Sequence, residues 1–314
     1  MNNTHQGPQI DPPAACQEIE DLLRTFLQNL HRDGAVVGVS GGLDSAVAAA
    51  FTVRSLGTEK VHLLNMPDRD SKPIHRKHAK HLAKHLRIQL NIKSITPILR
   101  AAGSYRLLPI GYMPGRNFRS KLVEYGKSRF LKNQGDQLLA ERLQPKANSW
   151  VSKGIAYAIA KHRIRMVVLY QYAELHNLMV VGAANRTEWL TGTFSKWGVD
   201  HCADVMPLIH LYRSQLEALA EYIQVPVSIR TKTADPDIMP GIDDKGILLG
   251  SFAIADRILY GLEMNVDQDQ LSHEYGKENV ERIMNLWELS KHMRESPYHV
   301  GLINIATLQR NISC

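Results

Sequence analysis

The chain has 314 residues, of which 44% are hydrophobic and 22% are charged, a balance that is typical of a soluble globular protein. No apolar run reaches the roughly 20 residues that a membrane-spanning helix needs, so a membrane protein is not expected. The formal charge of +7 favours polyanionic ligands such as nucleotides or pyrophosphate. No nucleic-acid recognition motif accompanies this charge, so nucleic acid is not expected as a partner.

The N-terminal segment and the cysteines indicate where the protein works. Residues 1–12 are polar, contain two prolines and lack the apolar core of a signal peptide, so we predict a disordered lead-in. The three cysteines, Cys16, Cys202 and Cys314, are far apart, odd in number and follow no metal-ligand spacing. They favour a reducing, cytoplasmic location.

Strand and helix patterns alternate along the first third of the chain. Apolar residues at helical spacing between Ile19 and Leu30 predict a helix, and the short apolar run 35–39 predicts a buried parallel strand. Alternation of this kind is typical of an α/β fold, so we predict a doubly wound parallel sheet with flanking helices. The next predicted elements are a helix from Ala46, a strand at 61–65, a helix at 74–86 and a strand at 88–92.

The alternation stops between Ile98 and about Val151, where the segment is basic and at best amphipathic. We interpret residues 99–150, approximately, as an insertion within one domain that spans residues 13–314. Helix and strand patterns resume after the insertion. They predict a helix at 166–175, a strand at 178–182 and helices at 214–222, 246–262 and 278–291.

The segment Ser40–Ser45, Ser-Gly-Gly-Leu-Asp-Ser, joins a predicted strand to a predicted helix. Its glycines let backbone N–H groups approach phosphate oxygens, and the start of the helix adds unpaired donors. Asp44 can hold Mg²⁺ through its carboxylate oxygens. The loop lacks the Gly-Lys-Ser/Thr of a Walker P-loop, so the γ-phosphoryl chemistry of those proteins is not implied. We predict a phosphate site, with a plain glycine-rich turn as the alternative.

This six-residue pattern resembles the PP-loop of the ATP pyrophosphatases, which cleave ATP between the α and β phosphates. Further segments resemble motifs of one branch, the ammonia-dependent NAD synthases. These segments are, in chain order, Lys161–Met166, Val180–Glu188, Thr191–Gly198, Asp204–Leu208, Thr233–Asp235 and Ser290–Pro297. Their order and approximate spacing hold from about residue 15 to residue 297. The resemblance implies the adenine nucleotide alpha-hydrolase-like fold of that family.

The resemblance also implies a reaction. A carboxylate of deamido-NAD would attack the α-phosphorus of ATP, and ammonia would displace AMP from the acyl-adenylate, with Mg²⁺ neutralising charge on the leaving pyrophosphate. No glutaminase module is visible in the sequence, so free ammonia or a separate glutaminase is the implied nitrogen donor. Members of the family pair as homodimers with the dinucleotide site at the interface, so a homodimer is expected.

Individual residues acquire implied roles from the matching motifs. Asp44 and Glu188 would bind Mg²⁺, and together with Arg213 they form the implied catalytic set. Arg213 stands where the family usually has Lys and would bind phosphate as a bidentate fork. The implied ATP-binding residues are Ser40, Gly41, Gly42, Asp44, Ser45, Arg165 and Thr233. The implied substrate-binding residues are Arg163, Asp200, Asp204 and His292. Solvated surface charge is the alternative interpretation of Glu188, Arg163 and Arg165, and an ordinary first-turn helix residue is the alternative for Arg213.

Three segments depart from the family pattern. Ala158-Ile159 stands where Gly-Asn is usual, and Gly198–Asp204 is one residue longer than its counterpart and lacks two glycines. The segment Asp243–Gly250 has lost most of its acidic residues. All three lie near the acceptor or lid regions of the family. ATP activation is therefore better supported than deamido-NAD as the acceptor.

Alternatives to this function remain open from the sequence. The chain can be a PP-loop amidase acting on a different carboxylate, in which case deamido-NAD would not stimulate AMP release. It can be a nucleotide-binding protein that has lost catalysis. A tRNA-modifying enzyme fits the charge but not the absence of paired catalytic cysteines, and RNA binding that weakens steeply with salt would favour it.

Four histidines, His75, His78, His81 and His85, are spaced along one predicted helix. Lysines are interleaved with them, and no carboxylate or cysteine lies beside them in the sequence. We therefore predict a solvated basic helix face here in preference to a metal site.

Overall fold

The computed structural model describes residues 7–107, 142–144, 146–147, 149–232, 249 and 251–295. Most of the predicted insertion, the predicted ATP-binding residue Thr233 and nearly all of the segment Asp243–Gly250 lie outside these ranges. The described part contains the predicted phosphate loop and every predicted strand.

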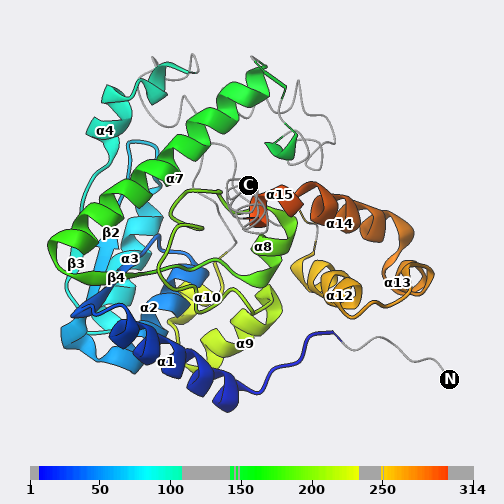
Figure 1. The fold of residues 1–314 in the computed structure, drawn as a ribbon, viewed down its shortest axis with the longest axis horizontal. Helices are drawn as coiled ribbons and strands as arrows, with labels where there is room; N and C mark the ends of the chain where they lie inside the picture. The colour runs from blue at the N-terminus through cyan, green and yellow to red at the C-terminus, as the bar shows by residue number, and fades with distance from the viewer. Residues whose placement is uncertain are drawn as a thin grey trace, which may run out of the picture.

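A parallel four-stranded sheet in the order β3-β2-β1-β4 forms the centre of the molecule (Figure 1). The strands are β1 (Gly34–Gly38), β2 (Val61–Asn65), β3 (Leu90–Ile92) and β4 (Leu178–Val181). Ala35 is paired with Val61 on one side and with Met179 on the other, which fixes β1 as a central strand. The predicted parallel sheet is confirmed, although β3 at the edge is two residues shorter than its predicted run.

Helices cover both faces of the sheet. They are α1 (Pro12–Asn29), α2 (Leu43–Leu56), α3 (Pro73–His85), α4 (Thr96–Ala101), α7 (Trp150–Leu175), α8 (Arg186–Thr191), α9 (Arg213–Tyr222), α10 (Val227–Arg230), α12 (Phe252–Glu263), α13 (Gln268–Tyr275), α14 (Lys277–Leu289) and α15 (Lys291–Arg294), with the short 3₁₀ turns Thr58–Lys60 and Ser104–Arg106. No helix in these ranges combines the length and apolar character needed to cross a membrane.

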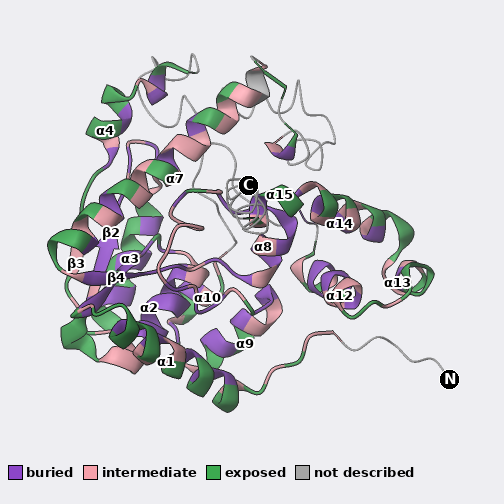
Figure 2. Cartoon of the chain, viewed as in Figure 1, coloured by how far each residue is buried: buried purple, intermediate pink, exposed green. Residues whose placement is uncertain are grey.

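Side chains along β1 point alternately to the two faces of the sheet, and this explains why an apolar core forms on each face. Ala35 and Val37 face a core made with α1, α2 and α9, whereas Val36 faces a separate core made with α7. All three side chains are fully buried, since successive residues of a strand point to opposite faces and both faces are covered. The sheet therefore appears buried throughout its centre in Figure 2.

Helix α7 is longer than the sequence predicts. The predicted segment 166–175 is only its second half, and the helix begins at Trp150 with Ser149 as its N-cap, whose hydroxyl accepts a hydrogen bond from the Ser152 N–H at 2.9 Å. In Figure 1 this long helix runs across the sheet.

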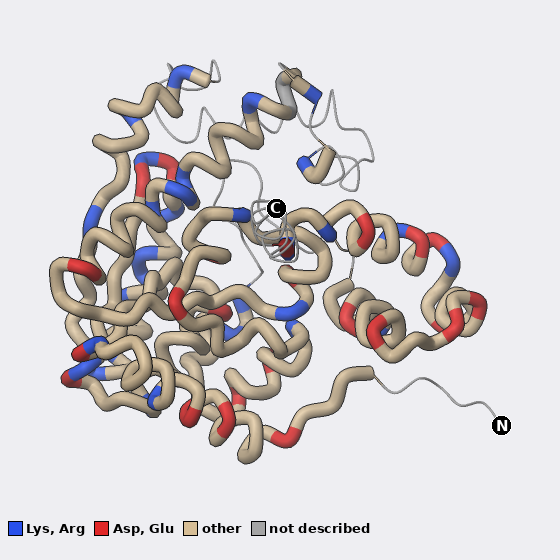
Figure 3. Tube along the Cα trace, viewed as in Figure 1, with Lys and Arg blue, Asp and Glu red and all other residues tan. Residues whose placement is uncertain are grey.

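A third apolar core joins α8 to the C-terminal helices α12, α13 and α14. These helices lie to one side of the sheet in Figure 1, and several Asp and Glu positions are coloured along them in Figure 3. The predicted helices at 246–262 and 278–291 correspond to α12 and α14, with α12 starting at Phe252. Through α8 this layer supports one wall of the site described next.

Candidate active site

A cavity of about 290 Å³ opens at the carboxyl ends of the strands. The segments that follow β1, β2 and β4 all contribute to its lining. Open parallel sheets bind ligands at this edge, where the connections from neighbouring strands diverge. The strand order places the central strand β1 and the loop that follows it at this point.

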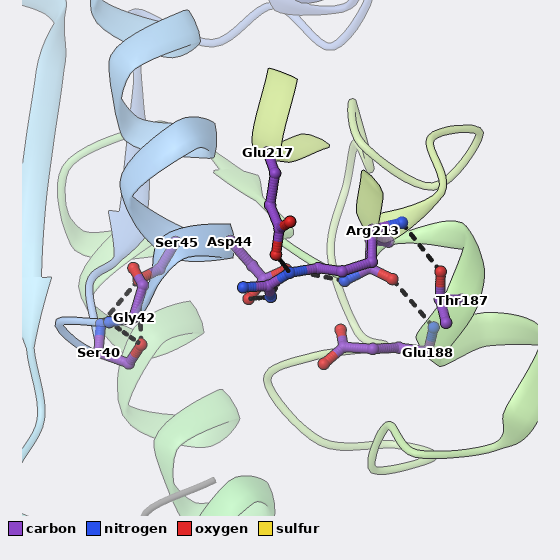
Figure 4. Close-up of polar contacts among 9 residues, drawn as sticks. Ser40, Gly42, Asp44, Ser45, Thr187, Glu188, Arg213 and Glu217 are labelled. Carbon is purple, nitrogen blue, oxygen red and sulfur yellow. Dashed lines mark hydrogen bonds and ion pairs between the residues drawn. The ribbon is translucent and has the colours of Figure 1, made fainter. Parts of the chain in front are cut away.

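The segment Ser40–Ser45, predicted to bind phosphate and called the phosphate loop from here on, follows β1 and leads into the first turn of α2. Gly41 adopts a φ of +84°, and a Cβ added to it would lie 2.1 Å from the carbonyl oxygen of His75. Only glycine fits there. The Ser45 hydroxyl accepts from the Ser40 N–H at 3.2 Å and lies 3.0 Å from the Ser40 hydroxyl, which accepts from the Gly42 N–H (Figure 4). The loop is thus folded as a compact cradle at the helix start.

Asp44 lies in the first turn of α2 and is paired with Arg213, the first residue of α9. Arg213 Nη1 lies 3.1 Å from Asp44 Oδ2, and its Nε donates to Glu217 at 2.8 Å (Figure 4). Burial favours loss of the proton from Arg213, but the charge of Asp44 and the bond to Glu217 outweigh it and raise the pKa of the guanidinium. Arg213 is therefore a fixed cation in the cavity wall.

Glu188 lies in the first turn of α8, is buried and lines the same cavity. Asn185 caps this helix by accepting the Glu188 N–H at 3.0 Å, and its amide nitrogen donates to Asp44 at 2.7 Å. The Asn185 side chain thus forms hydrogen bonds with both predicted metal ligands, Asp44 and Glu188. Figure 4 shows Asp44 and Glu188 reaching toward the same space from two different helices.

The chemistry of these donors suits Mg²⁺. Carboxylate oxygens are the ligands that Mg²⁺ prefers, and it usually takes one or two of them while keeping waters and substrate phosphate oxygens. Asp44 and Glu188 supply two such groups at one cavity. Among the residues that the structure describes, no cluster of three or more His, Cys, Asp or Glu side chains is arranged for a metal ion.

A buried ion cluster, which the sequence analysis did not single out, supports the wall after β2. Lys161 of α7 is fully buried, with its Nζ 2.8 Å from Asp68 Oδ2 and 3.0 Å from Asp70 Oδ2. Burial opposes ionisation of Asp68, but Lys161 and Arg165 outweigh it and lower the pKa of that carboxyl. Tyr157 also donates to Asp70. Two aspartates just after a strand end were the available sequence signal.

Arg165, one turn further along α7, is held at the cavity by a hydrogen bond from its side chain to the backbone after β2. Its Nε donates to the carbonyl oxygen of Met66 at 3.1 Å, and the residue lines the cavity. The predicted ATP-binding residues Ser40, Gly42, Asp44, Ser45 and Arg165 all line this cavity, and Gly41 lies within the same loop.

The predicted substrate-binding residues separate into two groups. Asp200 lines the main cavity. Arg163 lines a second cavity of about 260 Å³. Asp204 lines neither: its carboxylate accepts from the Tyr170 hydroxyl at 3.0 Å and from the Val180 N–H at 2.8 Å. His292 has an exposed side chain and lines neither cavity, although its carbonyl oxygen accepts from Lys196.

Arg142, inside the predicted insertion, is a cavity residue that sequence reasoning missed. It lines both cavities, and its Nη2 donates to the carbonyl oxygen of Phe194. Burial lowers the pKa of Arg142, while the charges of Asp200 and Glu188 oppose that shift. This arginine was indistinguishable in the sequence from the other basic residues around it.

The predicted solvated face of α3 is partly wrong. His81 and His85 are exposed, but His75 and His78 are buried against the phosphate loop. Burial, together with the charges of Lys232 and His75, lowers the pKa of His78. His75 Nδ1 lies 2.5 Å from Lys232 Nζ, and both residues line the main cavity. Helical spacing alone did not reveal which of the four histidines face the loop.

Comparison with known proteins places these features in one family. The model of the NAD synthase family matches residues 15–111 and 133–297. The NH(3)-dependent NAD(+) synthetase of Thermotoga neapolitana is 40% identical over 283 residues, covering 90% of this chain and 94% of the relative. The enzyme of the same name from Coprothermobacter proteolyticus is 34% identical, covering 90% of this chain and 96% of the relative.

Two solved structures share the fold over nearly the whole chain. An NMN synthetase from Francisella tularensis superposes with a TM-score of 0.67 at 25% identity, covering 94% of this chain and all of that one. An NH3-dependent NAD synthetase from Campylobacter jejuni superposes with a TM-score of 0.66 at 24% identity, covering 93% of this chain and all of that one.

Proposed function

The chain belongs to the NAD synthase family, and from this membership we propose that it is an ammonia-dependent NAD⁺ synthetase. It is a ligase that forms a carbon–nitrogen bond. The nicotinate carboxylate of deamido-NAD is first joined to AMP from ATP, with release of pyrophosphate. Ammonia then displaces AMP and leaves the amide of NAD⁺.

One observation carries the assignment of the ATP site. The phosphate loop and the two carboxylates Asp44 and Glu188 line a single cavity at the carboxyl ends of the strands. A loop that presents N–H groups at a helix start attracts phosphate, and carboxylates beside it would repel phosphate unless a cation lay between them. ATP with Mg²⁺ satisfies both requirements.

In the first step, the side chains of this cavity bind and orient the two anionic reactants. Ser40, Ser45 and the N-terminal N–H groups of α2 hold the pyrophosphate portion of ATP, because they are the hydrogen-bond donors of the loop. Arg213 supplies fixed positive charge beside Asp44, where negative charge accumulates on the leaving pyrophosphate. Mg²⁺, when bound by Asp44 and Glu188, neutralises charge on the phosphates.

The acceptor occupies the part of the main cavity that Asp200 and Arg142 line. Arg163 and Lys196 line the second cavity, which Arg142 also borders. Guanidinium and ammonium groups there fit the pyrophosphate of a dinucleotide and the carboxylate that is to be activated. We assign Asp204 and His292 supporting roles for the acceptor side, since neither lines a cavity.

Several features of the assembled enzyme belong to the same proposal. Thr233, which lies outside the described residues, is a proposed ATP-binding residue, and Lys232 just before it lines the cavity. The protein acts as a homodimer, with ammonia supplied free or by a separate glutaminase. Among the described residues Cys16 and Cys202 are free cysteines, and a reducing, cytoplasmic location is part of the proposal. The proposed domain comprises residues 13–314 with a basic insertion at about 99–150.

The test is AMP release from ATP with Mg²⁺ and ammonium, measured with and without deamido-NAD. We expect strong stimulation by deamido-NAD, an equal amount of NAD⁺, dependence on added Mg²⁺ after treatment with a chelator, and loss of both products in Asp44→Ala. A parallel assay uses nicotinate mononucleotide, because one of the similar structures is an NMN synthetase. ATP binding without stimulation by deamido-NAD would contradict the proposed acceptor.

A further inference from the structure

His162 lies in the candidate active site although the family pattern leaves its position unspecified. It is the second residue of the segment Lys161–Met166, between the fully buried Lys161 and the predicted substrate residue Arg163. Its side chain is only 12% exposed, and the residue lines the main cavity. Its Nδ1 lies 2.8 Å from Oδ2 of Asp200, whose side chain is one-third exposed.

Backbone packing fixes this pair. The Val199 N–H donates to the carbonyl oxygen of His162 at 3.1 Å, which ties the loop that carries Asp200 to helix α7. A Cβ added to Gly198 would lie 2.9 Å from Cβ of His162, so the glycine allows the loop to approach the helix this closely. The contact between imidazole and carboxylate therefore follows from the packing of two backbone segments.

The imidazole of His162 has hydrogen-bonding capacity that the described residues do not use. Nδ1 faces the Asp200 carboxylate at 2.8 Å, whereas Nε2 has no hydrogen-bond partner among them, and both nitrogens are buried. A buried polar atom without a partner is uncommon and destabilising, and such atoms often mark a bound ligand or a catalytic role. A histidine at a cavity wall beside a carboxylate is the arrangement in which imidazole accepts a proton.

The proposed reaction requires such a proton acceptor. At neutral pH most ammonia in solution is ammonium, which has no lone pair and cannot attack a carbonyl carbon. ATP activation by this chain does not need a base, because the attacking carboxylate is already ionised. The need for a base therefore arises only in the second step, on the side of the cavity where Asp200 lies.

We propose that His162 is the base that converts ammonium into ammonia, with Asp200 as its positioning residue; the inference rests on the proposed function. His162 accepts one proton from ammonium. The freed lone pair attacks the carbonyl carbon of the acyl-adenylate, and the bond from that carbon to the phosphate oxygen breaks, so AMP leaves with the electron pair. The nitrogen then loses a second proton to solvent, which leaves the neutral amide.

Other charged groups lie on the elements around this pair. Arg142, from the segment 142–144, interacts electrostatically with Asp200 and Glu188. In the part of the chain that the structure describes, the titratable and charged groups on these elements include Lys196 and His201 on the loop of Asp200, Glu188 on α8, and Lys161, Arg163 and Arg165 on α7 itself. The imidazole of His201 is part of an aromatic stack with Trp189 and Phe194, and burial lowers the pKa of that histidine.

The experiment compares wild type with His162→Gln, which keeps the polar side chain but cannot accept a proton at neutral pH. Exchange of labelled pyrophosphate into ATP, with deamido-NAD present, reports the first step and also shows that the variant is folded. Amide formation is then measured with ammonium and with hydroxylamine, which is largely unprotonated at pH 7. His85→Gln is the matched control, because His85 is exposed on α3.

The expected result has three parts. His162→Gln keeps pyrophosphate exchange, loses about 100-fold in kcat/KM for ammonium at pH 7, and loses much less with hydroxylamine. The loss in kcat/KM for ammonium, relative to wild type, becomes smaller as the pH approaches the pKa of ammonium, because free ammonia becomes abundant there. His85→Gln matches wild type throughout.

Equal losses with both nucleophiles, or unchanged kcat/KM for ammonium, would overturn the proposal. So would loss of pyrophosphate exchange in a folded His162→Gln, because His162 would then act in ATP activation. A second measurement compares pH profiles. Between pH 8 and pH 7, kcat/KM for total ammonium should fall about tenfold in His162→Gln, because free ammonia falls tenfold, and clearly less in wild type. Wild type that forms no NAD⁺ at all contradicts the proposed function itself and not this step.

Discussion

Arg213 and Asp44, separated by 169 positions in the chain, form an ion pair in the wall of the active-site cavity, with Nη1 3.1 Å from Oδ2. The pair joins the residue implied to bind Mg²⁺ to the one implied to bind phosphate. It compensates both charges when no nucleotide is bound, which a deeply buried cation and a half-buried carboxylate require. In the proposed complex, Mg²⁺ would replace Arg213 as the partner of Asp44, and a phosphate group would replace Asp44 as the partner of Arg213.

Two substitutions of Arg213 distinguish the effect of its positive charge from the effect of its forked guanidinium shape. We expect Arg213→Met to lower kcat/KM for ATP by about 100-fold, because a fixed cation beside the leaving pyrophosphate is lost. Arg213→Lys keeps the charge at the position where the family usually has Lys, and we expect a loss of about tenfold or less. Initial rates of AMP release at varied ATP check this. Equal losses in both variants would show that the positive charge is not what matters.

Arg142 provides a test on the acceptor side. It borders both cavities and lies near Asp200 and Glu188. We expect Arg142→Gln to raise KM for deamido-NAD by about 10- to 100-fold while changing KM for ATP less than threefold, since loss of one charge-assisted hydrogen bond costs roughly 1.5–3 kcal/mol. Steady-state kinetics with each substrate varied in turn measure the two effects. A larger effect on ATP than on deamido-NAD would contradict the assignment.

Two glycines with nearly the same φ form a matched pair. Gly41 has φ +84° and Gly57 has φ +83°, but a Cβ at Gly41 would lie 2.1 Å from the His75 carbonyl oxygen, whereas a Cβ at Gly57 meets nothing within 4 Å. We expect Gly57→Ala to cost roughly 1–3 kcal/mol of stability through backbone strain and to leave activity intact. Gly41→Ala must in addition displace the phosphate loop from α3.

For Gly41→Ala we therefore expect ATP-dependent AMP release to fall by more than 100-fold, with stability lowered by roughly 1–3 kcal/mol beyond the Gly57→Ala variant. Urea unfolding and AMP release measured on both variants give the comparison. Similar activities in the two alanine variants would show that the loop tolerates a shift away from His75.

The buried pair of Lys161 and Asp68 predicts how stability depends on pH. The pKa of Asp68 is lowered in the folded protein, so its contribution is present above the unfolded pKa of about 3.9 and is lost as the pH falls through the folded value. We expect the free energy of unfolding to decrease as the pH is lowered from about 5 toward 3, and Asp68→Asn to be less stable at neutral pH with a shallower decrease.

Urea denaturation at a series of pH values measures this slope. The control is Asp269→Asn, which removes an exposed carboxyl at the start of α13 and should leave the slope unchanged. Lys161→Met at neutral pH should cost about 3–5 kcal/mol, because two buried carboxylates lose their shared cation. A slope in Asp68→Asn as steep as that of wild type would assign the acid sensitivity to other carboxyls.

The family and the sheet were predictable because their signals are local. A run such as Ala35–Val39 is apolar at every position, which only a strand covered on both faces requires, and the loop Ser40–Ser45 carries its phosphate-binding chemistry in six consecutive residues. The limits of α7 were not predictable in the same way. Its first half, from Trp150, lies in a stretch where no clear apolar period separates helix from insertion.

The sequence by itself thus determined the α/β fold, the position of the phosphate loop and the family, since each depends on neighbouring residues or on the order of short motifs. Only the tertiary structure decided that Arg213 pairs with Asp44, that Lys161 neutralises two aspartates, that His162 meets Asp200, and that His75 and His78 are buried. These contacts depend on which face each helix turns toward the sheet and its loops. That orientation follows from packing over the whole domain, which no local pattern encodes.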